Sequence, residues 1–203
     1  MRSQLLQVFA KAPILGQVKT RLAVEIGRAK ACEVYEALLH HTLQNSVSNS
    51  WAGELWCSPD ISHESFQQYQ SAFGLVLREQ QADDLGGRML FALQAGLENA
   101  KKVVLIGTDC PVLTRDYIAA AFEKLDTVDV VFGPVEDGGY VLIACRKTNV
   151  ALFDGVDWST KKTLRQNILA IKRCGLTYAL LSTLWDVDTP DDYQRWLSGF
   201  FNQ

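Results

Sequence analysis

Long hydrophobic runs are absent from this sequence of 203 residues. A membrane-spanning helix needs about 18 consecutive apolar residues, and no such run exists here. The first residues, MRSQLLQVFAKAP, contain an apolar stretch too short for the core of a signal peptide and no small-residue cleavage pattern. We therefore expect a soluble, cytoplasmic protein with no membrane partner.

An excess of charge of one sign is also absent. The 20 Lys and Arg residues are balanced by 23 Asp and Glu residues, which leaves a net charge of -3. No run of basic residues forms a stripe that could follow a phosphate backbone. The sequence therefore predicts no nucleic-acid partner.

Residues that build disulfide frameworks, zinc sites and hydrolase triads are sparse. The five cysteines are odd in number, scattered and never arranged as C-x-x-C, which argues against a disulfide framework and a zinc site. The three histidines lie away from the predicted strand ends, and no G-x-S-x-G motif is present. We expect reduced, mostly buried thiols and no histidine-centred hydrolase.

Linkers and repeats are missing as well. The five prolines and 14 glycines are spread among turns, and no low-complexity tract or internal repeat interrupts the chain. Because a domain commonly holds about 100 to 200 residues, the length gives no reason to divide it. The sequence predicts a single domain over residues 1–203.

What is present is an alternation of short apolar runs with helical patterns. The expected strands cover residues 5–10, 54–57, 75–77, 103–106, 128–132, 140–144 and 177–181. The expected helices cover residues 22–46, 64–71, 85–100, 115–125, 160–174 and 191–200. Strands separated by helices predict a three-layer α/β/α fold with a mostly parallel sheet, mixed because the close pair around Gly138 and Gly139 could turn back antiparallel.

Residues 103–111, VVLIGTDCP, give the most informative local pattern. The run from Val103 to Ile106 has no polar alternation, which is typical of a central strand covered on both faces. Ligands of open α/β sheets bind beyond the carboxyl ends of the strands, so Asp109 is the first candidate for metal binding. The alternative is that Asp109 merely caps the helix expected near Thr114.

A loop with three cations follows the first predicted strand. Lys11, Lys19 and Arg21 precede a helix, where free N–H groups and the helix dipole favour phosphate. The loop is neither G-x-G-x-x-G nor a P-loop, which weakens NAD-binding and ATPase interpretations. A solvated loop without specific contacts is the alternative.

Carboxylates follow other predicted strands. Asp84 could cap the next helix, and Arg88 could reach a phosphate or pair with Asp84. Asp188 could complete a metal site with Asp109, since Mg²⁺ or Mn²⁺ needs only one or two carboxylates beside substrate phosphates and water. Asp191 and Asp192 suit the first turn of the last helix and are not assigned to the site.

Six motifs, taken together from Phe9 to Asp192, identify the family. They are F-A-K-A-P-x-x-G-x-V-K-T-R-L, D-L-G-x-R-M, I-G-T-D-C-P, G-P-x-x-D-G-G-Y, G-V-x-W-S-T and D-V-D-T-P-x-D. This set resembles the DUF2064 family of nucleotide-diphospho-sugar transferase-like proteins with the GT-A fold.

The resemblance implies a nucleotide-binding half with cations near the phosphates, a divalent cation on Asp109 with Asp188, and a separate acceptor side. It implies Asp109, Lys19 and Arg21 as catalytic residues. The expected nucleotide-binding residues are Ala10, Lys11, Pro13, Gly16, Lys19, Arg21, Asp84, Arg88 and Thr108. The expected acceptor-side residues are Asp137, Gly138, Gly139, Tyr140, Trp158, Ser159 and Thr160, although Trp158 could equally be ordinary packing.

Two departures keep the reaction open. Glycosyltransferases of this fold show Asp-x-Asp where this chain has Thr108-Asp109-Cys110, and nucleotidyltransferases begin with a Gly-rich loop where it has Lys11-Ala12-Pro13. The leading hypothesis is a metal-dependent glycosyltransferase that uses a nucleotide-diphosphate sugar and a small-molecule acceptor. The alternatives are nucleotidyl transfer from a nucleoside triphosphate with pyrophosphate release, and a non-catalytic nucleotide-binding accessory protein. The oligomeric state is not predicted.

Overall fold

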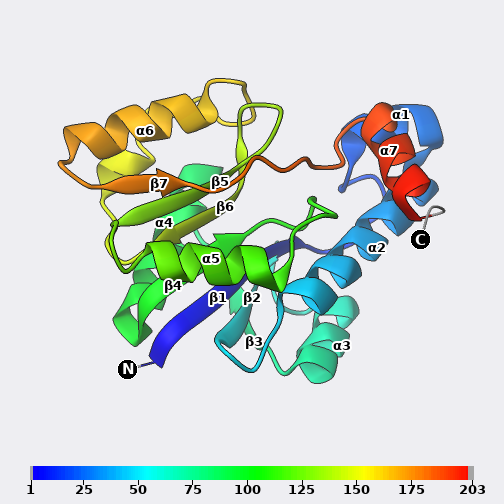
Figure 1. The fold of residues 1–203 in the computed structure, drawn as a ribbon. Helices are drawn as coiled ribbons and strands as arrows, with labels where there is room; N and C mark the ends of the chain where they lie inside the picture. The colour runs from blue at the N-terminus through cyan, green and yellow to red at the C-terminus, as the bar shows by residue number, and fades with distance from the viewer. Residues whose placement is uncertain (1, 201–203) are drawn as a thin grey trace.

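A seven-stranded sheet forms the centre of the computed structural model, which describes residues 2–200 (Figure 1). The strands are β1 (Arg2–Lys11), β2 (Ala52–Ser58), β3 (Val76–Glu79), β4 (Ala100–Ile106), β5 (Val130–Pro134), β6 (Tyr140–Cys145) and β7 (Tyr178–Leu180). Their order in the sheet is β3-β2-β1-β4-β6-β5-β7. Only β6 runs antiparallel to its neighbours β4 and β5, which confirms the mixed, mostly parallel sheet and the turn back at Gly138 and Gly139.

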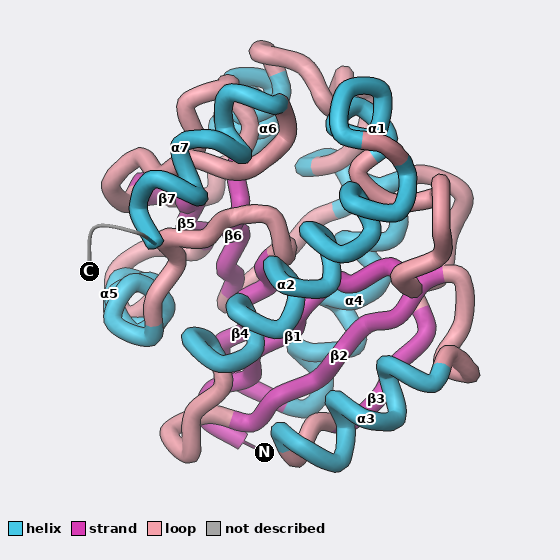
Figure 2. Tube along the Cα trace, turned by 90° about the vertical axis from the view of Figure 1, so that its right-hand side faces the viewer, coloured by secondary structure: helices cyan, strands magenta, loops and turns pink. Residues whose placement is uncertain are grey.

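Helices cover both faces of the sheet and give three layers. On one face lie α2 (Arg28–Ser46), α3 (Glu64–Phe73) and α5 (Arg115–Lys124), and on the other lie α4 (Leu85–Asn99) and α6 (Thr163–Arg173). Figure 2 shows α2 and α3 in front of β1 and β2, with α4 behind them. The predicted three-layer α/β/α architecture is therefore confirmed.

Strand β4 shows why an uninterrupted apolar run is needed at the centre. Val104 and Ile106 join the core beneath α2 and α5, whereas Val103 and Leu105 join the core beneath α4. All four side chains are buried. Because successive side chains point to opposite faces, a strand covered twice must be apolar at every position.

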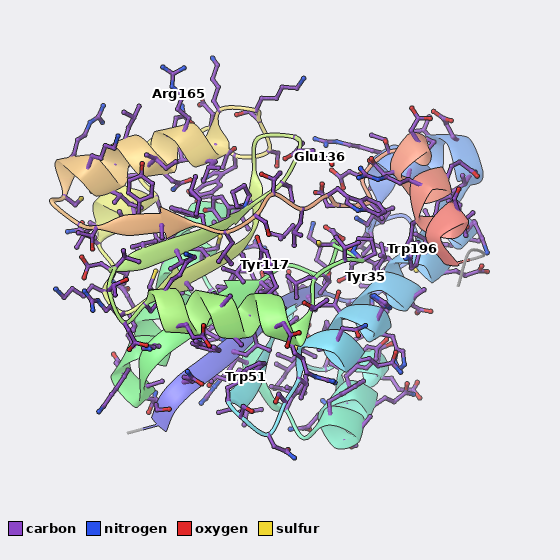
Figure 3. All side chains as sticks on the ribbon, in the orientation of Figure 1. Tyr35, Trp51, Tyr117, Glu136, Arg165 and Trp196 are labelled. Atoms are coloured by element: carbon purple, nitrogen blue, oxygen red, sulfur yellow. The ribbon has the colours of Figure 1, made fainter. Side chains whose placement is uncertain are left out.

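A third, smaller core lies beside the sheet rather than on it. It joins α1 (Thr20–Ile26), α2 and α7 (Pro190–Phe200) through buried side chains that include Leu22, Leu38 and Val187. Trp196, labelled in Figure 3, lies in this core between α7 and α2. The last described helix thus packs against the first two helices, next to the carboxyl end of the sheet.

The expected single helix over residues 22–46 is wrong, since the structure divides it into α1 and α2 at Gly27. Gly27 has φ +81, a value that breaks the helical hydrogen-bond ladder and that glycine adopts without steric cost. A short 3₁₀ helix, Val150–Leu152, was also not expected. None of the helices in residues 2–200 is long and apolar enough to cross a membrane.

Candidate functional site

The candidate site lies at the carboxyl ends of β1 and β4, where the order of the strands reverses. From β1 the chain continues to β2 on one side, and β4 pairs with β1 on the other. Ligands of open α/β sheets bind at this kind of switch point. A cavity of about 610 Å³ opens there, and its lining includes the predicted residues Ala10, Lys11, Lys19, Arg21, Arg88, Thr108, Asp109, Tyr140, Ser159 and Asp188.

Asp109 is not a helix cap. The N-cap of α5 is Thr114, whose hydroxyl accepts from the Tyr117 N–H at 3.3 Å. The Asp109 carbonyl accepts a hydrogen bond from the Val187 N–H at 2.9 Å, which fixes the end of β4 against the segment that leads to α7. Its carboxylate is 43% exposed and faces the cavity.

Lys19 fills the space between the two predicted metal ligands. Its ammonium lies 2.6 Å from Asp109 Oδ1, 2.6 Å from the Val187 carbonyl oxygen and 3.5 Å from Asp188 Oδ1. The Lys19 side chain is only 4% exposed. Arg21 adds a second cation, with Nη1 3.0 Å from Asp188 Oδ2. Two cations and two carboxylates therefore neutralise one another at the cavity wall.

The end of β1 is held rigidly in front of this cluster. The Tyr35 hydroxyl accepts from the Lys11 N–H at 2.7 Å and donates to the Lys11 carbonyl at 2.9 Å. Figure 3 labels Tyr35, which belongs to α2. Burial raises the pKa of Tyr35, so the phenol stays protonated and can serve as donor. Lys11 itself is exposed and forms no ion pair within residues 2–200.

Arg88 lines the cavity, and other predicted nucleotide-binding residues shape the loops around it. Asp84 caps α4 by accepting from the Gly87 N–H at 2.7 Å. Arg88 donates from Nε to the Ala82 carbonyl at 3.0 Å, and no ion pair joins it to Asp84 in the described chain. The Pro13 carbonyl accepts from the Cys32 thiol at 3.3 Å, and Gly16 lies in the following turn.

The predicted acceptor-side residues divide into two groups. Tyr140 and Ser159 line the cavity. The others shape the loops behind it: Asp137 accepts from the Gly139 N–H at 2.8 Å, Gly138 lies against the backbone of Lys161, and the Thr160 hydroxyl donates to the Asp157 carbonyl at 2.9 Å.

Trp158 packs on the first turn of α4. A Cβ atom at Gly86 would lie 2.6 Å from the indole ring, so the ring can approach the helix only because this residue has no side chain. The ring also stacks on Phe153, with centroids 6.3 Å apart. Trp158 thereby holds the loop that brings Ser159 to the cavity.

Backbone strain gathers around the cavity. The described residues other than glycine with positive φ are Lys19 (46°), Ala82 (104°) and Ser159 (59°). Lys19 and Ser159 line the cavity, and Ala82 precedes the lining residue Asp83. Such conformations cost about 1 to 3 kcal/mol each and concentrate at functional sites.

Sequence reasoning missed Asp186. Burial, together with the negative charges of Asp137, Asp188 and Asp109, raises the pKa of Asp186 to about 7. The D-V-D-T-P motif contained this residue, but only Asp188 was assigned a role. Gln80 and Asp83 also line the cavity, and neither belongs to any of the six sequence motifs.

The donor set suits a hard cation only in combination with a substrate. In residues 2–200, no three side chains of His, Cys, Asp or Glu come together as a metal centre. An Asp-x-Asp motif that includes Asp109 would need its other aspartate at position 107 or 111, where this chain has Gly107 and Pro111. Cys110, next to Asp109, is buried, and burial raises the pKa of its thiol to about 12. Asp109 and Asp188 supply carboxylate oxygens, which fit Mg²⁺ or Mn²⁺ if phosphate oxygens complete the coordination.

Solved structures with the same fold include several transferases. A candidate nucleotide-diphospho-sugar transferase from Desulfovibrio desulfuricans G20 is 29% identical, with a TM-score of 0.84 over 93% of this chain and 84% of that one. Glucosyl-3-phosphoglycerate synthase from Mycobacterium tuberculosis, in complex with Mn²⁺, UDP and glucosyl-3-phosphoglycerate, is 13% identical, with a TM-score of 0.59 over 98% and 76%. CMP:2-keto-3-deoxy-manno-octonic acid synthetase in complex with CTP is also 13% identical, with a TM-score of 0.59 over 98% and 99%.

A search of the curated proteins found no match. The model of one protein family, described as an uncharacterized protein conserved in bacteria, DUF2064, matches residues 42–160. This segment contains the strand β4, Asp109 and the turn that joins β5 to β6. The chain belongs to the DUF2064 family.

Proposed function

We propose that the protein is a transferase that uses a nucleotide-diphosphate sugar as donor and a small molecule as acceptor. The observation that carries this proposal is the cluster of Lys19, Arg21, Asp109 and Asp188 at the switch point of the sheet. A cavity of about 610 Å³ falls within the range of small-molecule and cofactor sites. A cytoplasmic location is part of the proposal, and five free cysteines fit a reducing compartment.

In this proposal Lys11, Lys19 and Arg21 bind the diphosphate, and Asp109 and Asp188 hold a divalent cation. Such a cation neutralises charge on a departing diphosphate. Lys19 and Arg21 add positive charge fixed in place before the reaction, which is the form of electrostatic stabilisation that costs no reorganisation. Asp84 and Arg88, with Ala10, Pro13, Gly16 and Thr108, support the nucleotide.

The acceptor then enters between β6 and the loop before α6. Tyr140 and Ser159 face the cavity from this side. Asp137, Gly138, Gly139 and Thr160 set the backbone of the two loops, and Trp158 anchors one of them on α4. This arrangement supports a donor half and an acceptor half on opposite walls of one cavity.

Nucleotidyl transfer is the second candidate, and the absence of a second carboxylate beside Asp109 favours it. The positions two residues from Asp109, where an Asp-x-Asp motif would place its other aspartate, hold Gly107 and Pro111. A lone strand-end aspartate with Lys19 and Arg21 suits displacement at the α-phosphate of a nucleoside triphosphate. Pyrophosphate would be the leaving group, and a phosphorylated small molecule the nucleophile.

The test is a donor screen with direct identification of products. The protein is incubated with each common sugar nucleotide or nucleoside triphosphate, with and without Mn²⁺, and thermal shift first selects the donors that stabilise the fold. Chromatography of turnover mixtures with pooled acceptors then separates the candidates. Metal-dependent release of nucleoside diphosphate supports sugar transfer, and pyrophosphate release supports nucleotidyl transfer instead. Tight binding without any product would replace both with a non-catalytic nucleotide-binding role.

A further inference from the structure

Lys19 binds to the same oxygen atoms that a divalent cation would use. Its ammonium contacts Asp109 Oδ1 and the Val187 carbonyl, each at 2.6 Å, and Asp188 Oδ1 at 3.5 Å. The residue predicted to bind phosphate is therefore committed to the residues predicted to bind metal. While this arrangement persists, Lys19 is not free to bind phosphate, and Asp109 and Asp188 are not free to bind metal.

The fold is built to put the ammonium there. Lys19 has a left-handed backbone, φ 46 and ψ 44, at the N-cap of α1, and its side chain is 4% exposed. The Val187 N–H donates to the Asp109 carbonyl while the Val187 carbonyl accepts from Lys19. Val187, in the segment before α7, therefore holds both Asp109 and Lys19 in place through its backbone N–H and carbonyl groups. A lysine held by three oxygen atoms in a strained conformation is not a solvated surface charge.

Arg21 completes the neutralisation from the solvent side. Its guanidinium lies 3.0 Å from Asp188 Oδ2 and is 65% exposed, so it can leave Asp188 at little cost. Lys19 is enclosed, and its departure would leave Asp109 without a cationic partner among the described residues, while Asp188 would keep Arg21.

We propose that ligand binding exchanges the partners within this cluster, an inference that rests on the phosphate and metal roles assigned in the proposed function. In the free protein Lys19 stands in for the cation between Asp109 and Asp188. A diphosphate draws Lys19 and Arg21 toward its own oxygens and thereby releases the two carboxylates for the metal. Metal and diphosphate then favour each other's binding, and the free protein binds each of them weakly alone.

The first experiment measures Mn²⁺ binding without any nucleotide, by electron paramagnetic resonance of free Mn²⁺. Lys19→Met removes the ammonium and keeps the length of the side chain. We expect Mn²⁺ affinity to rise on the order of tenfold, the scale of typical coupling between sites. Lys11→Met is the matched control, because Lys11 lines the same cavity and forms no ion pair within residues 2–200. The Mn²⁺ affinity of this variant should change by less than about twofold.

The second experiment measures the other half of the exchange with pyrophosphate, which carries no base or sugar. Asp109→Asn removes one carboxylate charge from Lys19, and titration calorimetry in the presence of a chelator excludes metal. We expect pyrophosphate to bind to the Asp109→Asn variant several-fold more tightly than to the wild type. This change lies near the lower end of the range of about 5- to 150-fold that is usual for coupling between two sites. Asp83→Asn removes a carboxylate from the same cavity without freeing Lys19 and should have a smaller effect.

Unchanged or weaker Mn²⁺ binding by Lys19→Met, or a change no larger than that of Lys11→Met, would overturn the exchange. If Lys19→Met does not fold, as judged by its thermal transition, the pyrophosphate titration decides alone, and equal affinities of Asp109→Asn and wild type would reject it. Neither measurement uses a donor or an acceptor. The exchange can therefore hold where transferase activity is not found, and activity can be found where the exchange fails.

Discussion

Two groups of opposite charges, at opposite ends of the sheet, differ in how completely their carboxylates are enclosed. Asp129 precedes β5 and lies at the level of the amino end of β4, as the pairing of both strands with β6 shows. It accepts from the Thr177 N–H at 3.0 Å, the Thr177 hydroxyl at 2.8 Å and Arg146 Nε at 3.1 Å, with Lys147 at 3.4 Å. Its side chain is 8% exposed, against 43% for Asp109.

The difference separates a structural carboxylate from one available for a ligand. Asp129 has donors on both oxygens, which hold its pKa well below the usual range. Among the described residues, Asp109 has one side-chain partner, Lys19, and an open cavity lies in front of its carboxylate. Counting ion pairs would rate the two groups alike, but the enclosure of the carboxylate distinguishes them.

The largest expected effect is on activity at the open group. Asp109→Ala should lower the transfer rate by more than about 100-fold, because in the proposed function it removes a ligand of the cation that stabilises the leaving group. Its melting temperature should change less than that of a variant at an enclosed carboxylate, since the Asp109 side chain is 43% exposed and Lys19 keeps the Val187 carbonyl and Asp188 as partners. Steady-state kinetics and thermal unfolding measure both. Transfer at the wild-type rate would end the assignment of Asp109 to the site.

The reverse result is expected at the enclosed group. Asp129→Asn should lower the free energy of unfolding by about 1 to 3 kcal/mol at pH 7, because charge-assisted hydrogen bonds are lost, and leave transfer activity unchanged. Because the folded pKa of Asp129 lies below the unfolded value, its stabilisation is present above about pH 4 and disappears as the pH falls below it. Denaturant unfolding at several pH values should show the variant and wild type converging in acid. A constant difference down to about pH 2 would contradict this origin.

A smaller effect is expected where the loop that carries Trp158 and Ser159 rests on α4. Gly86→Ala gains about 1 kcal/mol of helix propensity, but its Cβ would lie 2.6 Å from the Trp158 ring, and relieving such a clash costs about 1 to 3 kcal/mol. We expect net destabilisation and a change in Trp158 fluorescence. Gly199→Ala is the control, because nothing lies within 4 Å of the position that its Cβ would take in α7. Equal stabilisation of both variants would show that the ring moves aside freely.

The smallest effect separates two roles of Asp84. Asp84→Ala should lower stability by about 1 kcal/mol because it removes the N-cap of α4, whereas Asp84→Asn keeps a capping oxygen and should lose little. Nucleotide affinity, measured by thermal shift, gives the second readout. If both variants lose affinity, Asp84 contacts the nucleotide as a charge. If only Asp84→Ala loses affinity, Asp84 affects the nucleotide by capping α4 and not by its charge.

Patterns confined to one element were predictable from the sequence. The apolar run of β4 and the cap at Asp84 depend on neighbours in the chain, and both are confirmed. The break at Gly27 was not predicted, because apolar residues continue with helical spacing on both sides of it. The contact of Lys19 with Asp188 joins residues 169 apart in sequence, so no local pattern could reveal that the predicted cations and carboxylates pair with each other.

The position of Val187 late in the chain determines when the site is completed during synthesis. Residues 181–189 run from β7 to α7 and supply both the carbonyl that holds Lys19 and the carboxylate of Asp188 (Figure 1). All seven strands precede this segment in the chain. A nascent chain can therefore assemble the whole sheet while Lys19 still lacks two of its three oxygen partners. The cluster of Lys19, Asp109 and Asp188 is thus completed only after all seven strands have been synthesised.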